Sequence, residues 1–111
     1  MDPIEAALQE AIRRAVSIGW KMRRRVARDM RSRECCALGA YLVSVGDGWV
    51  WPSIFAAGEA LGLGADDASA LAKGFDNGAK YSSTPRETKM SLIGARLWEF
   101  SKEVDPSLRR R

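Results

Sequence analysis

The chain has 111 residues, of which 46% are apolar and 29% charged, and its formal net charge is +4. This composition is typical of one globular domain and excludes a disordered or low-complexity chain. The sequence has no histidine and two cysteines, Cys35 and Cys36, which excludes histidine-dependent catalytic triads and a cysteine–histidine zinc site.

The first predicted element is one long amphipathic helix from Ile4 to Met30. Asp2 is its predicted N-cap, Pro3 suits its first turn, and Glu5 stands at the capping-box position. At about 100° per residue, one side of this helix is apolar; it carries Ile4, Leu8, Ile12, Ala15, Gly19, Met22, Val26 and Met30. Gly19 is the weak position, where a break or a close helix contact is expected.

The other side of this predicted helix is strongly basic. Nine basic residues lie between Arg13 and Arg33, against Asp29 alone. Guanidinium groups bind phosphate oxygens in pairs, so this face is a candidate nucleic-acid-binding surface. Its candidate residues are Arg13, Arg14, Lys21, Arg24, Arg28 and Arg31, and the tail Arg109–Arg111 adds to them. The alternative interpretation is a solvated basic helix face.

An apolar run of 11 residues, Cys35 to Val45, follows. It is too short to span a bilayer and predicts a buried core segment. We favour a helix here; the alternative for residues 35–51 is a β-hairpin with strands at Tyr41–Val45 and Trp49–Trp51. The two cysteines are interpreted as buried thiols of a reducing compartment, and a strained bridge between them is the alternative.

Two short helices are predicted next. The first runs from Pro52 to Leu61 and ends at Gly62. The second begins at Asp66 and Asp67, which suit the positive end of a helix dipole, and stops at Asn77-Gly78. Both segments are rich in alanine and glycine.

The last predicted helix begins with the cap, proline and glutamate of Thr84–Glu87. Its apolar stripe is Met90, Ile93, Leu97, Phe100 and Val104, and Asp105-Pro106 ends it. Two longer amphipathic helices thus bracket short ones. The sequence predicts an all-α, irregular bundle of four to five helices over residues 1–105, followed by a basic tail over residues 106–111.

Three short segments, Cys36–Ala40, Leu61–Leu63 and Gly74–Gly78, resemble a pattern in short uncharacterised bacterial and phage proteins. In that pattern a Cys-x-Leu-Gly run precedes Leu-Gly-Leu and a Gly-Phe-Asp-x-Gly ending. The resemblance covers roughly the middle 40 residues. It implies a small accessory protein of prokaryotic or phage origin, and it implies no activity.

Candidate catalytic and metal-binding patterns are weak. Adjacent residues point about 100° apart on a helix, so Asp66 and Asp67 do not share a site. Asp76–Gly78 lacks the alternating oxygen ligands and closing glutamate of a calcium loop, and the glycines near Gly62 lack the lysine of a phosphate loop. The sequence therefore predicts a binding protein that is not an enzyme, with no cofactor and no metal.

A protein-interaction module is the alternative function. Trp20 and Trp98 lie off the apolar stripes of their predicted helices, where they are candidate interface anchors. The partner would be an acidic protein or a second copy of the chain; in the alternative interpretation these rings close the bundle. The acidic, capped N-terminus lacks the features of a signal peptide, so we expect a cytoplasmic location and no membrane association.

Overall fold

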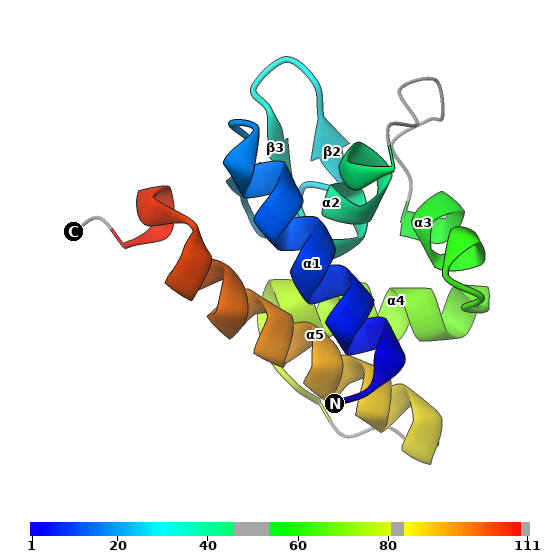
Figure 1. The fold of residues 1–111 in the computed structure, drawn as a ribbon. Helices are drawn as coiled ribbons and strands as arrows, with labels where there is room; N and C mark the ends of the chain where they lie inside the picture. The colour runs from blue at the N-terminus through cyan, green and yellow to red at the C-terminus, as the bar shows by residue number, and fades with distance from the viewer. Residues whose placement is uncertain (46–53, 81–83, 110–111) are drawn as a thin grey trace.

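The computed structural model describes residues 1–45, 54–80 and 84–109. In these ranges the chain forms five α-helices, three short strands and a 3-10 turn (Figure 1). They are, in order, α1 Pro3–Ser17, β1 Lys21–Met22, β2 Arg28–Asp29, β3 Glu34–Cys35, α2 Ala37–Ser44, α3 Ile54–Ala60, α4 Ala65–Asn77, α5 Pro85–Val104 and η1 Pro106–Leu108. The protein is mostly helical, as predicted, but the small sheet was not expected.

The predicted helix from residue 4 to residue 30 is wrong in its second half. α1 ends at Ser17, and Gly19 adopts a φ of +98°. The chain then folds back, so that the backbone N–H of Trp20 donates to the carbonyl of Ala15 at 3.0 Å. Glycine reaches this left-handed conformation without a steric penalty, so the one weak residue of the helical pattern became its end.

The residues beyond the break pair in a sheet with the order β1-β3-β2. β1 runs parallel to β3, with Lys21 opposite Glu34, and β2 runs antiparallel to β3, with Asp29 opposite Glu34. This register brings the chain before β1 and the β2–β3 turn to the same end of the sheet, where β1 and β3 begin and β2 ends. Figure 1 shows that turn at the top of the molecule, beside the C-terminal end of α1.

The helix starts predicted from local signals are confirmed. The Asp2 carboxylate accepts the Ile4 N–H at 2.8 Å, and the Thr84 side chain caps α5. Gly62 and Gly78, which follow α3 and α4, have φ of +79° and +90°. Glu5 has another role from the predicted one: it is buried and binds both Nε and Nη2 of Arg96 on α5, at 3.0 and 2.8 Å.

The helix expected after Cys35 is also confirmed, as α2. Tyr41–Ser44 is helical, so the first strand of the alternative hairpin is wrong. The second proposed strand, Trp49–Trp51, and the predicted helix start at Pro52 lie outside the described residues. α3 falls within the predicted range 52–61.

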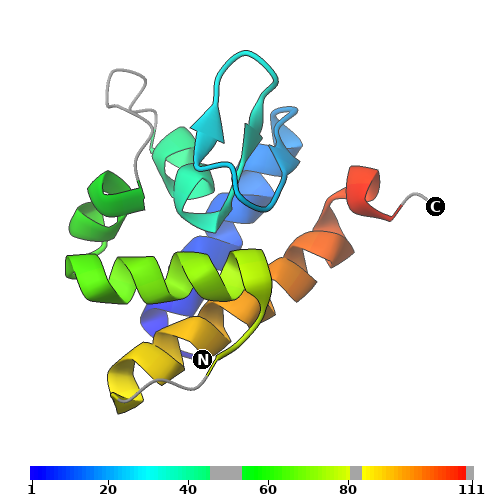
Figure 2. The same cartoon turned by 180° about the vertical axis from the view of Figure 1, so that it is seen from behind.

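The core lies between α4 and α5, which cross each other closely, and α1 and α2, which pack on each other and on α5 (Figure 2). Two glycines set the closeness of this crossing. A Cβ on Gly74 would lie 2.1 Å from the carbonyl oxygen of Ser91, and a Cβ on Gly94 would lie 2.0 Å from that of Leu71. Around the crossing the largest fully buried side chains are Leu8, Ile12, Met22, Leu38, Leu71, Phe75, Ile93 and Leu97.

The first residues of the predicted basic tail are ordered against the body of the protein. Pro106–Leu108 forms η1, and Asp105, which is 2% exposed, connects it to the sheet. Its Oδ2 accepts the Met22 N–H at 2.7 Å, and its Oδ1 accepts the Ser107 N–H at 2.9 Å. One buried carboxylate thus joins the end of α5 to β1.

Candidate functional site

The six candidate phosphate-binding residues do not form one helix face, because α1 ends before four of them. Arg13 and Arg14 remain on α1, where their guanidinium groups lie 3.8 and 3.3 Å from the Glu10 carboxylate. Arg13 also lies over the Phe100 ring, 5.0 Å from its centroid. Both side chains are more than half exposed, but each has an anionic neighbour.

Arg24 belongs to a structural contact, contrary to prediction. Its Nε donates to the carbonyl of Phe75 at 2.8 Å, and its guanidinium lies 4.5 Å from the centroid of the Trp98 ring. The neighbouring Arg25 N–H donates to Asp76 at 2.8 Å. Arginines at the C-terminal end of α4 complement the partial negative charge of that end, so this loop docks onto the helix.

The predicted position of Arg28, on the exposed side of a long helix, is also wrong. It lies in β2 and is only 6% exposed. A buried guanidinium has no access to the phosphates of a large ligand. The basic face inferred from helical periodicity therefore loses both Arg24 and Arg28.

The remaining two candidates, Lys21 and Arg31, lie near Arg33 at the end of the sheet that carries the β2–β3 turn. Lys21 is exposed in β1, its N–H donates to the Arg33 carbonyl at 2.8 Å, and Arg31 and Arg33 are exposed in the β2–β3 turn. Within the described ranges, none of these three side chains forms an ion pair with a carboxylate. We call Ile18, Lys21, Met30, Arg31 and Arg33 the basic tip.

The turn that carries the two arginines is held by its own acidic residues. Oδ1 of Asp29 accepts the N–H groups of Arg31 and Ser32 at 3.0 and 3.4 Å. These backbone hydrogen bonds, the Arg31 one foremost, hold the pKa of Asp29 below its usual value. Glu34 accepts from the Ser32 hydroxyl at 3.2 Å and pairs with Arg23 at 3.4 Å.

Three residues of the basic tip were not predicted as site residues from the sequence: Ile18, Met30 and Arg33. Arg33 has a φ of +57°, an unusual conformation for a residue with a side chain. The available signal was the turn chemistry of Asp29 and Ser32, since such side chains bond to nearby backbone and favour turns over helix interiors. Helical periodicity concealed it.

The two candidate interface tryptophans are less exposed than expected. Trp20 is 8% exposed and belongs to the core, so its predicted surface position is wrong. Trp98 is half-buried and packs edge-to-face on Phe75, with ring centroids 5.3 Å apart. With Arg24 over its ring, Trp98 contributes mainly to packing in this structure.

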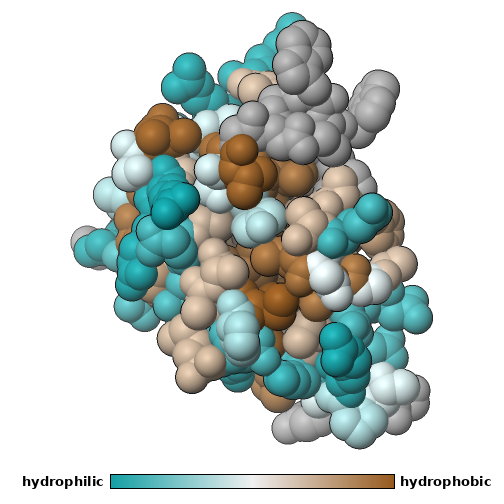
Figure 3. Space-filling model, turned by 45° about the vertical axis from the view of Figure 1, so that its right-hand side comes forward, coloured by the Kyte–Doolittle hydropathy of each residue, from teal (hydrophilic) through white to brown (hydrophobic). Residues whose placement is uncertain are grey.

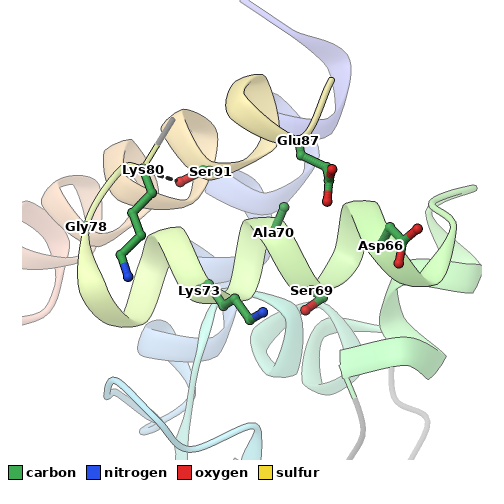
Figure 4. Close-up of a pocket in the computed structure, with 8 residues that line it drawn as sticks. All are labelled: Asp66, Ser69, Ala70, Lys73, Gly78, Lys80, Glu87 and Ser91. Atoms are coloured by element: carbon green, nitrogen blue, oxygen red, sulfur yellow. Dashed lines mark hydrogen bonds between the residues drawn. The ribbon is translucent and has the colours of Figure 1, made fainter. Parts of the chain in front are cut away.

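A separate cavity of about 310 Å³ lies between α4 and the start of α5 (Figure 4). Lys73 and Lys80 lie toward one end and Asp66 and Glu87 toward the other. At the lysine end, the Lys80 N–H donates to the Ser91 hydroxyl at 2.8 Å. Because both charge signs line it, this cavity has no net preference for an anion.

Neither cysteine offers thiol chemistry at neutral pH. Both are free and buried, as the sequence predicted, and the alternative of a bridge between them is wrong. Burial raises the pKa of Cys35 to about 12 and that of Cys36 to about 11, whereas the reactive species is the thiolate. In the described part of the chain, no group of three or more acidic or cysteine side chains is placed to hold a metal ion.

Comparison with known protein families, curated proteins and solved structures gives no match. The functional argument therefore depends on the geometry of the chain itself. Among the described helices, none combines the length and apolarity needed to cross a bilayer.

Proposed function

We propose that the protein is a small non-catalytic binding protein that binds a polyanion, nucleic acid in the first place, through the basic tip. The observation that carries the proposal is the grouping of Lys21, Arg31 and Arg33, three exposed cations without a carboxylate partner in the described ranges, at one end of the molecule. Unpaired cations on one surface add their potentials at a ligand phosphate.

The other basic residues support this assignment by contrast. Arg86 pairs with Asp67, Lys89 with Asp2, Arg96 with Glu5 and Lys102 with Glu99. Lys73 and Lys80 share their cavity with Asp66 and Glu87. Arg25 and Arg109 are also exposed and form no ion pair in the described ranges, but Arg25 donates to the Asn77 side chain and Arg109 to the Glu103 carbonyl. The grouped cations that these ranges leave for a ligand are therefore those of the basic tip.

With three cations in place of six, the proposal requires a weaker dependence of binding affinity on salt than the helix face would give. Six phosphate contacts on one helix face would give a slope of log affinity against log salt of about −5, whereas the three cations of the tip give about −2.7 on duplex DNA. Affinity should then fall roughly 40-fold between about 50 and 200 mM salt. This smaller slope distinguishes the tip from the helix face inferred from the sequence.

The test is fluorescence anisotropy of labelled oligonucleotides with two double variants. Arg31→Glu/Arg33→Glu removes two cations of the tip and should reduce the slope by about 2, with a loss of affinity above tenfold at low salt. The control Lys73→Glu/Lys80→Glu changes the net charge equally at the cavity and should leave affinity within about threefold. Salt-insensitive binding, or equal losses in both variants, would overturn the proposal.

A protein-interaction module is the second candidate, and one surface feature favours it. Figure 3 shows hydrophobic residues exposed in the middle of the face between α1 and α3. Both helices pack on α2. An apolar area of this kind fits an acidic protein partner or a second copy of the chain. Sedimentation velocity tests the second copy: a mass well above 12.2 kDa that falls on dilution supports it, and a constant monomer mass contradicts it.

A further inference from the structure

Two large apolar side chains accompany the cations of the basic tip. Ile18 and Met30 are each 58% exposed, more than any other large hydrophobic residue of the described ranges except Met1. Exposing such side chains costs free energy in water. They stand beside three cations that form no ion pair in the described ranges, which indicates a ligand with an anionic surface and an apolar interior.

The sheet register places the chain segments of these two residues on either side of Arg33. Because Lys21 and Asp29 both lie opposite Glu34, continuing the register by one residue places Arg33 between Trp20 and Met30 at this end of the sheet. Two strand spacings, about 10 Å, separate the chain at β1 from that at β2. Ile18 stands at the β1 side and Met30 at the β2 side.

Both apolar residues are held on ordered backbone. The Ile18 N–H donates to the carbonyls of Arg14 and Ala15 at 3.2 Å each, at the end of α1. The turn after Met30 is closed by the hydrogen bonds from Arg31 and Ser32 to Asp29. The tip therefore presents its apolar side chains without needing to fold on binding, which reduces the entropic cost of inserting them.

The chemistry of these side chains distinguishes duplex from single-stranded ligands. Proteins that bind single strands stack bases on aromatic rings, whereas the aromatic residue that the described ranges place next to the tip, Trp20, is buried. Aliphatic and methionine side chains instead act as wedges between the base pairs of a duplex, entering from the minor groove, while nearby cations contact the phosphates.

We propose that the basic tip binds duplex DNA in the minor groove and kinks it by inserting Ile18, Met30 or both between base pairs, with Lys21, Arg31 and Arg33 on the flanking phosphates. This inference depends on the proposed function, since it names the ligand of the same site. Steps that unstack easily, such as TA, should be bound in preference to stiff A-tracts.

The test measures bending by energy transfer between dyes at the two ends of a short duplex with a central TA step. We expect the protein to raise the transfer efficiency, and Ile18→Ser/Met30→Ser to abolish the rise and weaken binding about tenfold. Because no charge changes, the slope of log affinity against log salt should stay the same in this variant. The matched control is Leu92→Ser, since Leu92 is 39% exposed on α5; it should bend DNA like the parent protein.

Each other outcome overturns the inference in a recognisable way. Salt-dependent binding without bending, or bending that persists in Ile18→Ser/Met30→Ser, contradicts the insertion of these side chains but agrees with the proposed function. No binding to any oligonucleotide contradicts both the insertion and the proposed nucleic-acid binding. Binding to phosphatidylglycerol vesicles that needs Ile18 and Met30, with no binding to DNA, identifies an anionic membrane as the ligand in place of DNA.

Discussion

The arginines of this protein have different structural roles, and the residues around each one determine its role. Arg24 closes the end of α4, Arg28 is buried in β2, and Arg31 extends into solvent from a turn. In the sequence these arginines are equivalent members of one basic run. The difference arises from long-range contacts, such as that between Arg24 and Phe75, 51 positions apart.

For Arg24 the structure predicts a stability effect without a binding effect. Arg24→Gln should lower the free energy of unfolding by about 1–2 kcal/mol, because it removes the hydrogen bond to Phe75 and the contact with the Trp98 ring. Affinity for nucleic acid should change less than threefold. Urea unfolding measures the stability and fluorescence anisotropy the affinity. A large loss of affinity with unchanged stability would contradict this prediction and show that Arg24 contacts the ligand.

Gly94 is a residue at which even a methyl side chain should lower the free energy of unfolding strongly. Gly94→Ala places a Cβ where the Leu71 carbonyl lies 2.0 Å away, so α4 and α5 must separate, and we expect a loss of about 3 kcal/mol. The control Gly64→Ala meets no atom within 4 Å and should cost under about 1 kcal/mol, mostly through the N-cap preference. Equal losses in urea unfolding would contradict the close crossing.

At the scale of elements, helix starts were predictable and one helix end was not. The caps at Asp2 and Thr84 depend on residues within three positions, so local pattern finds them. The end of α1 depends on competition between a helix and a sheet whose third strand lies beyond the turn. Hydrophobic periodicity contains no information about strand pairing between distant segments, so the predicted helix continued through Gly19.

The cap of α1 predicts a pH-dependent stability difference. The side-chain contact with Lys89 and the Ile4 N–H hold the pKa of Asp2 below its ordinary value of 3.8. The stabilisation by this carboxylate is therefore complete above the ordinary value and is lost as the pH falls through the lowered one. Asp2→Ala should cost about 1 kcal/mol at neutral pH, with the difference from the parent shrinking toward acid.

Urea unfolding from about pH 6 down to about pH 3 measures this difference. The control is Asp2→Asn, since asparagine caps a helix as well as aspartate does but carries no charge. It should retain most of the stability at neutral pH, and, because neither variant has the titrating carboxyl, the stability of both should depend less on pH than that of the parent. A difference between parent and Asp2→Ala that stays constant with pH would contradict a charged cap.

At the scale of the whole molecule, the core joins segments from both ends of the chain. Cys35 ends β3 and Cys36 is the N-cap of α2, and both are almost fully buried. Glu5 of α1 meets Arg96 of α5, 91 positions away. Because these contacts form together, we expect the described ranges to unfold as one cooperative unit.

Thiol reactivity tests this cooperativity. With pKa values of about 12 and 11, Cys35 and Cys36 are protonated as well as shielded at about pH 8. A disulfide reagent should modify them at least about 100-fold more slowly in the native protein than in urea. The rate should rise with denaturant as the unfolded fraction rises, and fast labelling of the native protein would contradict a closed core.

By itself the sequence determined the helical class, the starts of α1 and α5, the ends of α3 and α4, and the burial of the two cysteines. All of these depend on caps, glycines and apolar runs within a few residues of one another. Only the tertiary structure decided the end of α1, the three-stranded sheet and the sorting of the arginines into structural and exposed ones. Those features depend on which distant backbone groups and carboxylates each residue meets, and that information arises only when the chain has folded.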